Sequence, residues 1–317
     1  MAYQLGTFRP AVGDAFAGVL VGEQVVPLAE LGFGATTVEA LLADWARSSA
    51  ALDAAVSGGA VPASALALSS LTAAAPFVPN QVFQSGANYR THVVQLMVAA
   101  AAEQGADDLD DVRARAVATM DERASSGTPY VFLGLPSAVC GPVDDVVLPP
   151  TGVQHDWELE LGVVIGAYAY LVDRDRAMDC VAGYVIVNDL STRDRIFRPD
   201  IPSLGTDWLA GKNAPTFLPL GPWVTPARFV PDPMDLRICL SLNGEVMQDE
   251  STADMIFDIP RLIEHVSAIT PLRPGDLLLT GSPAGNGAHY GRYLRAGDVM
   301  EGAITGLGTQ RNRCVIR

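Results

Sequence analysis

The sequence predicts an α+β fold that is mainly β, with a small α+β domain ahead of a larger β-rich domain. Apolar, strand-like segments separated by tight turns dominate the chain after residue 76, and helical periodicity is confined to a few segments. Residues 57–75 are rich in Gly, Ala, Ser and Pro, a composition typical of a connector between domains. We therefore expect an N-terminal domain with its linker at 1–75 and a second domain at 76–317.

The N-terminal domain is expected to contain a hairpin followed by a helix. Apolar residues before and after Gly22-Glu23 predict two strands joined by a tight turn. Thr36 and Glu39 have the spacing of a capping box, and apolar residues then recur at helical spacing to about residue 55. One helix is therefore predicted from Thr36 onward.

The larger domain carries mostly strand signals. Asn243-Gly244 joins two apolar arms, which is a strong hairpin signal, and Gly-Asp turns at residues 275 and 297 each precede an apolar strand. Asp258 is a predicted helix cap, and residues 99–126 predict a further helix with acidic residues near its start. Neither phosphate-loop motif of nucleotide-binding proteins is present.

Composition argues against several classes of partner. The chain has 317 residues, 21 basic and 36 acidic, so its formal charge of −15 opposes binding to nucleic acid or to anionic membranes. No apolar run approaches the roughly 20 residues that span a bilayer, and the first residues do not form a secretory signal, so a cytoplasmic protein is expected. The four cysteines lie far apart, which disfavours a zinc site or a disulfide framework.

Three carboxylates are candidate metal ligands. Glu158 and Glu160 are two apart in a predicted buried strand and therefore face the same side, while Asp189 lies where another apolar strand ends. A divalent cation such as Mg²⁺ or Ca²⁺ would offset the cost of placing these charges together. The alternatives are a solvated strand face at Glu158 and Glu160 and an ordinary turn at Asp189.

Lys212 and His92 are the other candidates for chemistry. Lys212 is the only lysine in a chain whose other basic residues are all arginine, and an amine is more compact than a guanidinium; chance survival of a surface lysine is the alternative. Of the four histidines, His92 is the best candidate for a general base. The Gly-rich loop 282–287 offers backbone amides to an anionic substrate group, although most such loops are only turns.

Taken together, these segments resemble the fumarylacetoacetate hydrolase family from about residue 76 onward. The matched motifs, in order, are N-Y-x-x-H at 88–92, E-x-E and its apolar run at 158–166, N-D-x-[ST]-x-R-D at 188–194, W-x-x-G-K at 208–212, N-G-E-x-x-Q at 243–248, G-D-x-x-x-T-G-[ST]-P-x-G-x-G at 275–287 and G-L-G at 306–308.

The resemblance implies a mixed β-sandwich roll, a homodimer and a small-molecule 2-oxo acid substrate. It implies a Mg²⁺ site, with Mn²⁺ or Ca²⁺ as alternatives, whose ligands are Glu158, Glu160 and Asp189. His92 is then the base that activates water, and Lys212 places a positive charge beside the developing oxyanion. Substrate binding is assigned to four residues of the matched motifs, Asn88, Tyr89, Gly281 and Ser282.

The function expected from this resemblance is metal-dependent hydrolysis of a C–C bond in acylpyruvate-like 2,4-dioxo acids. Within the same family, a decarboxylase, isomerase or hydratase of 2-oxo acids or diacids is the alternative, because one metal–enolate chemistry serves all of these reactions. Outside it, the alternative is a catalytically silent homologue that binds a metal or a ligand.

The chain departs from the family pattern in ways that bear on activity. Gln95 stands where a glutamate often accompanies the histidine; an amide orients an imidazole without compensating its charge, and Glu122 is a candidate replacement. Gly134 and Ile196 replace a frequent lysine and glutamine. We also expect a helical lid insertion at about 96–127, longer than a minimal family lid.

Overall fold

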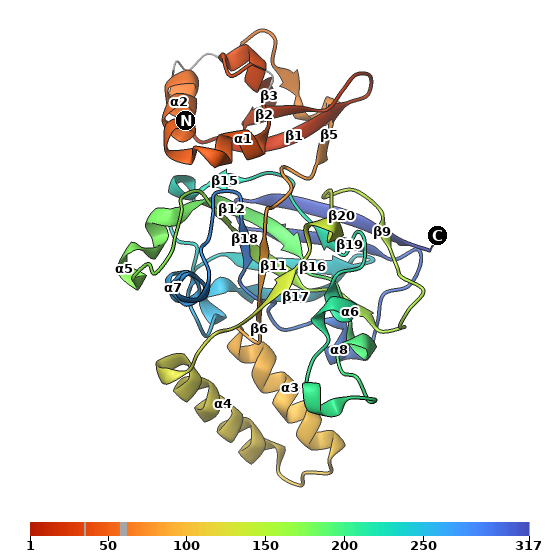
Figure 1. The fold of residues 1–317 in the computed structure, drawn as a ribbon. Coiled ribbons are helices and arrows are strands. Elements are labelled where there is room, and N and C mark those ends of the chain that lie inside the picture. Colours follow the sequence, from red (N-terminus) through yellow and green to blue (C-terminus); the bar gives the residue numbers. More distant parts are fainter. Residues whose placement is uncertain (35, 58–61, 317) are drawn as a thin grey trace.

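The computed structural model describes residues 1–34, 36–57 and 62–316. A small sheet with two helices forms one end of the molecule, packed strands form the middle, and a pair of helices projects at the other end (Figure 1). The mainly-sheet α+β class predicted from the sequence is confirmed.

The N-terminal region forms a five-stranded antiparallel sheet with two helices beside it. The hairpin at Gly22-Glu23 is confirmed, because the two strands on either side of these residues pair in register. In spatial order the strands are β4 (Leu66–Ala67), β3 (Gln24–Pro27), β2 (Phe16–Val21), β1 (Gln4–Pro10) and β5 (Leu71–Ala74).

Two details of this region differ from the sequence predictions. The expected connector is wrong for its second half, since β4 and β5 pair with β3 and β1; residues 58–61 lie outside the described part. The predicted helix is two helices, α1 (Val38–Ala43) and α2 (Trp45–Ser57), and its cap is Thr37, whose side chain accepts from the Ala40 amide. Glu39 does not complete a capping box, because its carboxylate accepts from the amide of Val78.

The central part contains a six-stranded mixed sheet. Its two longest strands, β11 and β12, pair antiparallel and are buried along their whole length. In spatial order the strands are β15 (Thr225–Pro226), β12 (Val181–Asn188), β11 (Leu159–Ile165), β18 (Leu277–Leu279), β6 (Val82–Gly86) and β7 (Tyr130–Gly134). Near-continuous apolar runs are expected for strands that are covered on both faces.

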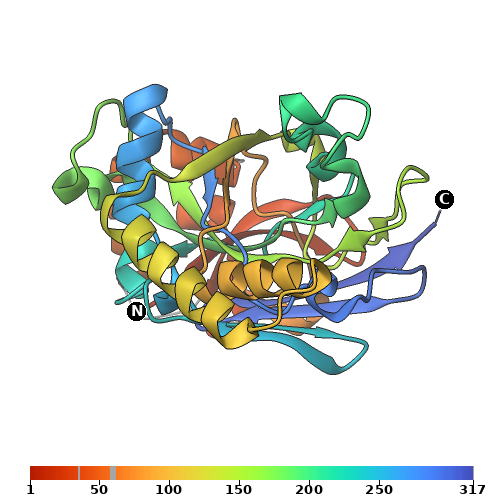
Figure 2. The same ribbon diagram turned by 90° about the horizontal axis from the view of Figure 1, so that it is seen from below.

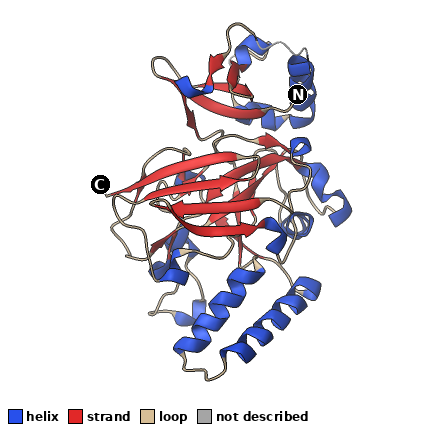
Figure 3. Cartoon of the chain, turned by 180° about the vertical axis from the view of Figure 1, so that it is seen from behind, coloured by secondary structure: helices blue, strands red, loops and turns tan. Residues whose placement is uncertain are grey.

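A second sheet covers one face of the first (Figure 3). Its strands are β17 (Glu245–Ser251), β16 (Arg237–Leu242), β19 (Val299–Ile304), β20 (Gly308–Val315) and β9 (Val146–Val147). The predicted Asn243-Gly244 hairpin joins β16 to β17, and both turn residues have positive φ. Leu159 of β11, Ile238 of β16 and Met300 of β19 belong to one apolar core between the sheets.

The N-terminal region shares a second apolar core with the opposite face of the six-stranded sheet. Leu5 and Val19 of the N-terminal sheet pack in one cluster with Val164 of β11 and Val185 of β12. The six-stranded sheet is therefore the middle layer of the molecule. The division at residue 75 stays a prediction, since the two parts are joined by this core.

Two helices form a hairpin at the end far from the N-terminal sheet (Figure 1), and they lie in front of the strands when the molecule is seen from below (Figure 2). The single helix expected at 99–126 is wrong: α3 (Arg90–Glu103) ends before Gly105, whose φ is +80°, and α4 (Leu109–Ser126) begins after Asp108, which caps it. A role of this hairpin as a lid stays a prediction. The predicted Asp258 cap is confirmed, since its side chain accepts from the amide of Arg261 at the start of α7 (Ile259–Ile269).

The remaining elements are short and connect the larger ones. No helix in the described residues is long and apolar enough to cross a membrane. The short elements are strands β8 (Val139–Cys140), β10 (His155–Asp156), β13 (Ser191–Thr192) and β14 (Leu218–Pro219), helices α5 (Arg174–Ala177), α6 (Trp208–Lys212) and α8 (Gly287–Tyr290), and single 3₁₀ turns at 28–31, 68–70, 136–138, 178–180, 193–195, 202–204, 227–229 and 252–254.

The contact between the two sheets predicts the effect of adding volume at Gly302. A Cβ atom there would lie 2.5 Å from a methyl carbon of Leu159. We expect Gly302→Val to lower the free energy of unfolding by about 1–3 kcal/mol, measured by urea denaturation, because β11, which carries Glu160 and directly follows Glu158, must shift. Ala303→Val, on the other face of β19, is the matched control and is expected to change it by less than about 0.5 kcal/mol.

Candidate metal and catalytic site

The three predicted carboxylates converge at one end of the β11–β12 pair. Glu158 directly precedes β11, Glu160 is its second residue, and Asp189 directly follows β12. Because the strands are antiparallel, with Leu159 opposite Asn188, the start of one lies beside the end of the other. One oxygen of each carboxylate lies within 4.8 Å of those of the other two, and all three side chains are buried.

Two cations are built into this cluster. Lys212 donates from Nζ to Glu158 Oε2 at 2.6 Å, to Asp189 Oδ2 at 2.8 Å and to the Asp189 carbonyl at 2.8 Å. Arg193 pairs with Glu158 and, through Nε, with Asp156 at 2.9 Å. An ammonium has three N–H groups, so the donors of Lys212 are fully used.

The two cations do not affect the pKa of the three carboxylates equally. Burial alone would raise the pKa of Glu158, but Arg193 and Lys212 lower it to about 2. Burial raises the pKa of Asp189 to about 6, against the opposing charge of Lys212. Burial and the adjacent charge of Asp189 hold the pKa of Glu160 well above its usual range.

The surroundings of Glu160 therefore indicate whether a divalent cation fits this cluster. Its carboxylate accepts from the Gly281 amide at 2.8 Å, and none of the ion pairs among the described residues includes it. A buried carboxylate without a cationic partner is costly, and oxygen donors from three carboxylates match a hard divalent cation. Glu158, Glu160 and Asp189 are the residues that would hold it.

His92 lies in the first turn of α3, which begins before the helical insertion expected at about 96–127. It is buried, and burial lowers its pKa to about 4, although the charge of Glu158 opposes this shift. Its polar neighbour is Asn286, whose Nδ2 lies 3.5 Å from His92 Nε2. The imidazole is therefore neutral at neutral pH, which is the form that accepts a proton.

Among the described residues, no hydrogen bond joins His92 to its expected partners, Gln95 and Glu122. Gln95 lies one turn further along α3, and its Oε1 is buried without a hydrogen-bond partner in the described structure. The side chain of Glu122 on α4 is exposed, so nothing here supports it as a replacement for the family glutamate. Orientation of His92 by Gln95 stays a prediction.

Three of the four residues assigned to substrate binding already have partners within the protein. Asn88 donates to the carbonyls of Phe257 and Thr280, so it fastens the start of α3. The Gly281 amide holds Glu160, and Ser282 Oγ accepts from Gln248 Nε2 at 3.0 Å. Their direct contact with substrate stays a prediction.

Tyr89, the fourth of these residues, is fully buried. Burial raises the pKa of its phenol, and the charge of Glu160 adds to that shift. Tyr89 is therefore a neutral group beside the carboxylate cluster, and its contact with substrate also stays a prediction.

Four further residues of the site did not stand out in the sequence. Arg193 lies within the matched motif at 188–194, which carried a signal for it that charge spacing alone did not reveal, whereas Asp156 lies two residues ahead of the matched segment at 158–166. Gln84 of β6 donates to Asp189 Oδ1 at 2.5 Å, and Asn286 faces His92; both partnerships join residues more than 100 positions apart. No local sequence pattern predicts such pairs.

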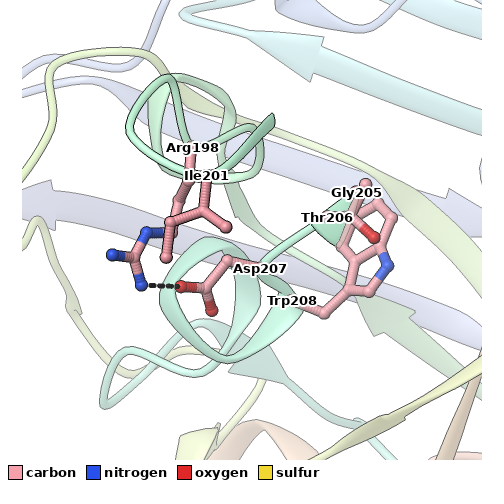
Figure 4. Close-up of a pocket in the computed structure, with 6 residues that line it drawn as sticks. All are labelled: Arg198, Ile201, Gly205, Thr206, Asp207 and Trp208. Atoms are coloured by element: carbon pink, nitrogen blue, oxygen red, sulfur yellow. Dashed lines mark ion pairs between the residues drawn. The ribbon is translucent and has the colours of Figure 1, made fainter. Parts of the chain in front are cut away.

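The loop that leads into α6 positions Lys212, the last residue of this helix, in the carboxylate cluster. Asp207 caps α6 by accepting from the Ala210 amide, and its carboxylate also faces Arg198 at 3.7 Å (Figure 4). Arg198 and Asp207 line a pocket of about 210 Å³ together with Ile201, Gly205, Thr206 and Trp208. Among the described residues that line it, none is a predicted ligand or base, so this pocket is distinct from the carboxylate cluster.

Comparison with known proteins identifies the family. Residues 81–315 match the fumarylacetoacetate (FAA) hydrolase C-terminal family. The chain belongs to the fumarylacetoacetate hydrolase family. This membership confirms the resemblance drawn from the motifs and agrees with the observed mainly-sheet architecture.

Members with named activities are similar to this chain. A 2,4-didehydro-3-deoxy-L-rhamnonate hydrolase from Sphingomonas sp. is 46% identical over 188 residues, which cover 58% of this chain and 64% of that protein. The crystal structure of maleylpyruvate hydrolase from Sphingobium sp., in complex with manganese(II) and pyruvate, has a TM-score of 0.73 and 27% identity, with 99% of each chain covered. A 2-hydroxyhepta-2,4-diene-1,7-dioate isomerase from Mycobacterium marinum has a TM-score of 0.69 and 27% identity, with 100% of this chain and 99% of that chain covered.

These relatives support the prediction of a family enzyme. The match to the Sphingomonas hydrolase spans less than two thirds of that protein's length, so its activity is not transferred by similarity alone. The manganese in the Sphingobium structure and the buried acidic cluster together suggest a divalent-metal site in this chain.

The isolated charge of Glu160 predicts that Glu160→Gln has opposite effects on metal binding and on stability. Removing a carboxylate ligand should weaken Mg²⁺ or Mn²⁺ binding at least about tenfold in calorimetric titration. Without metal, the variant should be at least as stable as the wild type in urea, because burial and the charge of Asp189 disfavour the ionised form of Glu160 and glutamine cannot ionise. Unchanged metal affinity would exclude the three-carboxylate site.

The low pKa of His92 predicts the effect of restoring a carboxylate at position 95. A negative charge near the imidazole favours imidazolium, so Gln95→Glu should raise the pKa of His92 and move the acidic limb of the pH–rate profile to higher pH. Gln95→Met, which adds no charge, is the control. If the acidic limb is the same in both variants, His92 is not the group that titrates there.

Proposed function

We propose that this protein hydrolyses the C3–C4 bond of 2,4-dioxo acids in a reaction that depends on a divalent metal. The observation that carries the proposal is the buried cluster of Glu158, Glu160 and Asp189, with the neutral base His92 close enough to be influenced by the charge of Glu158. The Sphingomonas relative supports it, because its name describes a hydrolase of a 3-deoxy acid with oxo groups at C2 and C4.

The reaction balances with water as the only co-substrate. Water adds its hydroxyl group to C4 and the C3–C4 bond breaks, its electron pair remaining on C3. Protonation of C3 then gives pyruvate, and the acyl part leaves as a carboxylate. When bound, the cation supplies Lewis-acid charge that stabilises the negative charge developing on the 2-oxo oxygen.

The chain's own residues supply the proton transfer and the electrostatic setting. The imidazole of His92 takes a proton from the attacking water and can return it to C3. Lys212 keeps Glu158 and Asp189 ionised and in place; burial alone would lower its pKa, but the charges of these two carboxylates raise it. For the predicted role at the C4 oxyanion, Lys212 must exchange one of its present hydrogen bonds for the substrate.

Mg²⁺ is the cation we propose, with Mn²⁺ and Ca²⁺ as alternatives. Carboxylate oxygens suit all three ions, and the manganese complex of the Sphingobium hydrolase supports Mn²⁺ as a second choice. A homodimer and a cytoplasmic location stay predictions; sedimentation velocity of the purified protein tests the first.

Isomerisation of an unsaturated 2-oxo diacid is the second candidate, because the Mycobacterium marinum relative of that name is similar to this chain over its whole length. Turnover of a panel of 2-oxo acids, with and without Mg²⁺, separates the candidates. The hydrolase proposal predicts release of pyruvate from 2,4-dioxo acids and none without metal. It fails if only double-bond migration is observed.

The dense contacts of Lys212 predict that arginine is a poor substitute. A planar guanidinium is bulkier and cannot reach all three oxygens with the same geometry, so Lys212→Arg should lower kcat/KM at least about tenfold, equivalent to about 1.4 kcal/mol. Arg198→Lys, outside the cluster, is the control. Wild-type turnover by Lys212→Arg would show that only the positive charge matters.

Loss of the base is the direct test of the proton transfer. His92→Ala should reduce pyruvate release at least about 100-fold, while Mg²⁺ affinity measured by calorimetry stays close to wild type, since His92 is not a proposed ligand. If His92→Ala retains full hydrolysis, the proposed role of His92 is wrong, and a reaction that needs no hydrolytic water becomes the better account.

A further inference from the structure

Gln84 places a neutral amide against one of the predicted metal ligands. Its side chain is 2% exposed, and Nε2 donates to Asp189 Oδ1 at 2.5 Å. Its Oε1 is buried and has no hydrogen-bond partner in the part of the chain that the structure describes. Among the described residues, Asp189 is therefore the hydrogen-bond partner of this amide.

The chemistry of Asp189 determines which end of the amide faces it. An ionised carboxylate only accepts hydrogen bonds, so Gln84 must turn its N–H group, and not its oxygen, towards Oδ1. The other oxygen, Oδ2, and the backbone carbonyl of Asp189 accept from Lys212. Each carboxylate oxygen has more than one lone pair, so Oδ1 can accept from Gln84 and still bind a cation.

The strand register places Gln84 on the face of the sheet that carries Glu160. Gln84 of β6 lies opposite Leu279 of β18, and Leu279 lies opposite Gly162 of β11. Glu160 is two residues before Gly162 in β11, so its side chain is on the same side of the sheet. The pairing of three strands therefore brings Gln84 to the metal-binding side, although it lies more than 70 residues before Glu160 in the sequence.

Gly134 leaves the space that this amide occupies. Gln84 pairs with Phe132 of β7, and Gly134 is two residues further along the same strand, on the same face. A Cβ atom at Gly134 would lie 2.7 Å from Gln84 Oε1, 2.8 Å from its Cδ and 3.1 Å from its Nε2. These three nearest atoms all belong to Gln84. A side chain at position 134, where the family pattern often has lysine, would therefore displace the amide from Asp189.

We propose that Gln84 is a positioning residue of the metal site, which holds the Asp189 carboxylate ready for the cation, and that Gly134 is the residue that permits this contact. Partners that fix the orientation of a metal ligand typically contribute tenfold to 100-fold to metal affinity. The inference rests on the proposed function, because it requires the divalent cation on which that function depends. It adds two residues to the site, neither of which is a ligand or the base.

Calorimetric titration of Mn²⁺ into the metal-free protein and three variants tests the proposal. Gln84→Met keeps the approximate size of the side chain and removes the donor, so it should weaken Mn²⁺ binding about tenfold or more. Gly134→Ala keeps the glutamine and displaces its amide, so it should weaken binding in the same direction. In the double variant, Gly134→Ala should cause no further loss beyond about twofold, because its effect passes through the amide that is already gone.

A second glutamine of the chain offers a matched control. Gln81 Nε2 donates to Oδ2 of the buried Asp276 at 2.9 Å, and neither residue is part of the carboxylate cluster. Gln81→Met should leave Mn²⁺ affinity at the wild-type value. Urea denaturation of the metal-free variants identifies a purely structural role: in that case Gln84→Met would lower the free energy of unfolding and leave Mn²⁺ affinity unchanged.

The outcomes separate this inference from the proposed function. Wild-type Mn²⁺ affinity in Gln84→Met, or losses that add up in the double variant, would overturn the inference and leave the proposed function standing. If Gln84→Met does not fold, Gly134→Ala decides, and unchanged affinity in that variant overturns the inference. The expected affinities without release of pyruvate from any 2,4-dioxo acid would contradict the proposed function alone. A wild-type protein that binds no Mn²⁺ would contradict both.

Discussion

The site depends on one electrostatic imbalance: four buried carboxylates face two cations. Glu158, Glu160, Asp189 and Asp156 lie within a network in which only Lys212 and Arg193 are positively charged. A buried group of charges is stable only where each charge has an oppositely charged partner and hydrogen bonds. Glu160 is the carboxylate left without a counter-ion, and this deficit is the physical reason to expect a divalent cation.

The rest of the fold holds the carboxylates of the site in position. The paired ends of β11 and β12 fix Glu158 and Asp189, β6 supplies Gln84, and the loop after β18 supplies the Gly281 amide. On the opposite face of β11, Leu159 packs into the apolar core between the six-stranded sheet and the second sheet, so the carboxylates cannot move apart without disturbing that core. The packing of the surrounding strands thus keeps the buried charges close together.

The sequence predicted the parts of the site that follow local rules. Alternation along a strand placed Glu158 and Glu160 on one side, the end of an apolar run marked Asp189, and the lone lysine marked Lys212. Caps and turns were also readable, as at Asp258 and Asn243.

The sequence predictions failed where contacts between residues far apart in the sequence determine the structure. Residues 66–74 looked like a linker because the two strands within this segment have only two and four residues and little pattern of their own, yet β5 pairs with β1. The start of α3 at Arg90 and the use of Asn88 as an anchor depend on the distant carbonyls of Phe257 and Thr280. The pairing of Asn286 with His92 likewise exists only once the chain is folded.

Counting bound Mn²⁺ by electron paramagnetic resonance tests the central claim most directly. The free ion gives a strong signal that bound ion loses, so titration of the metal-free protein reports the number of sites. The account predicts one tight site per chain, which excess Mg²⁺ displaces and which Asp189→Asn weakens strongly. No bound Mn²⁺, or binding that Asp189→Asn leaves intact, would contradict the claim that the buried carboxylates form a divalent-metal site.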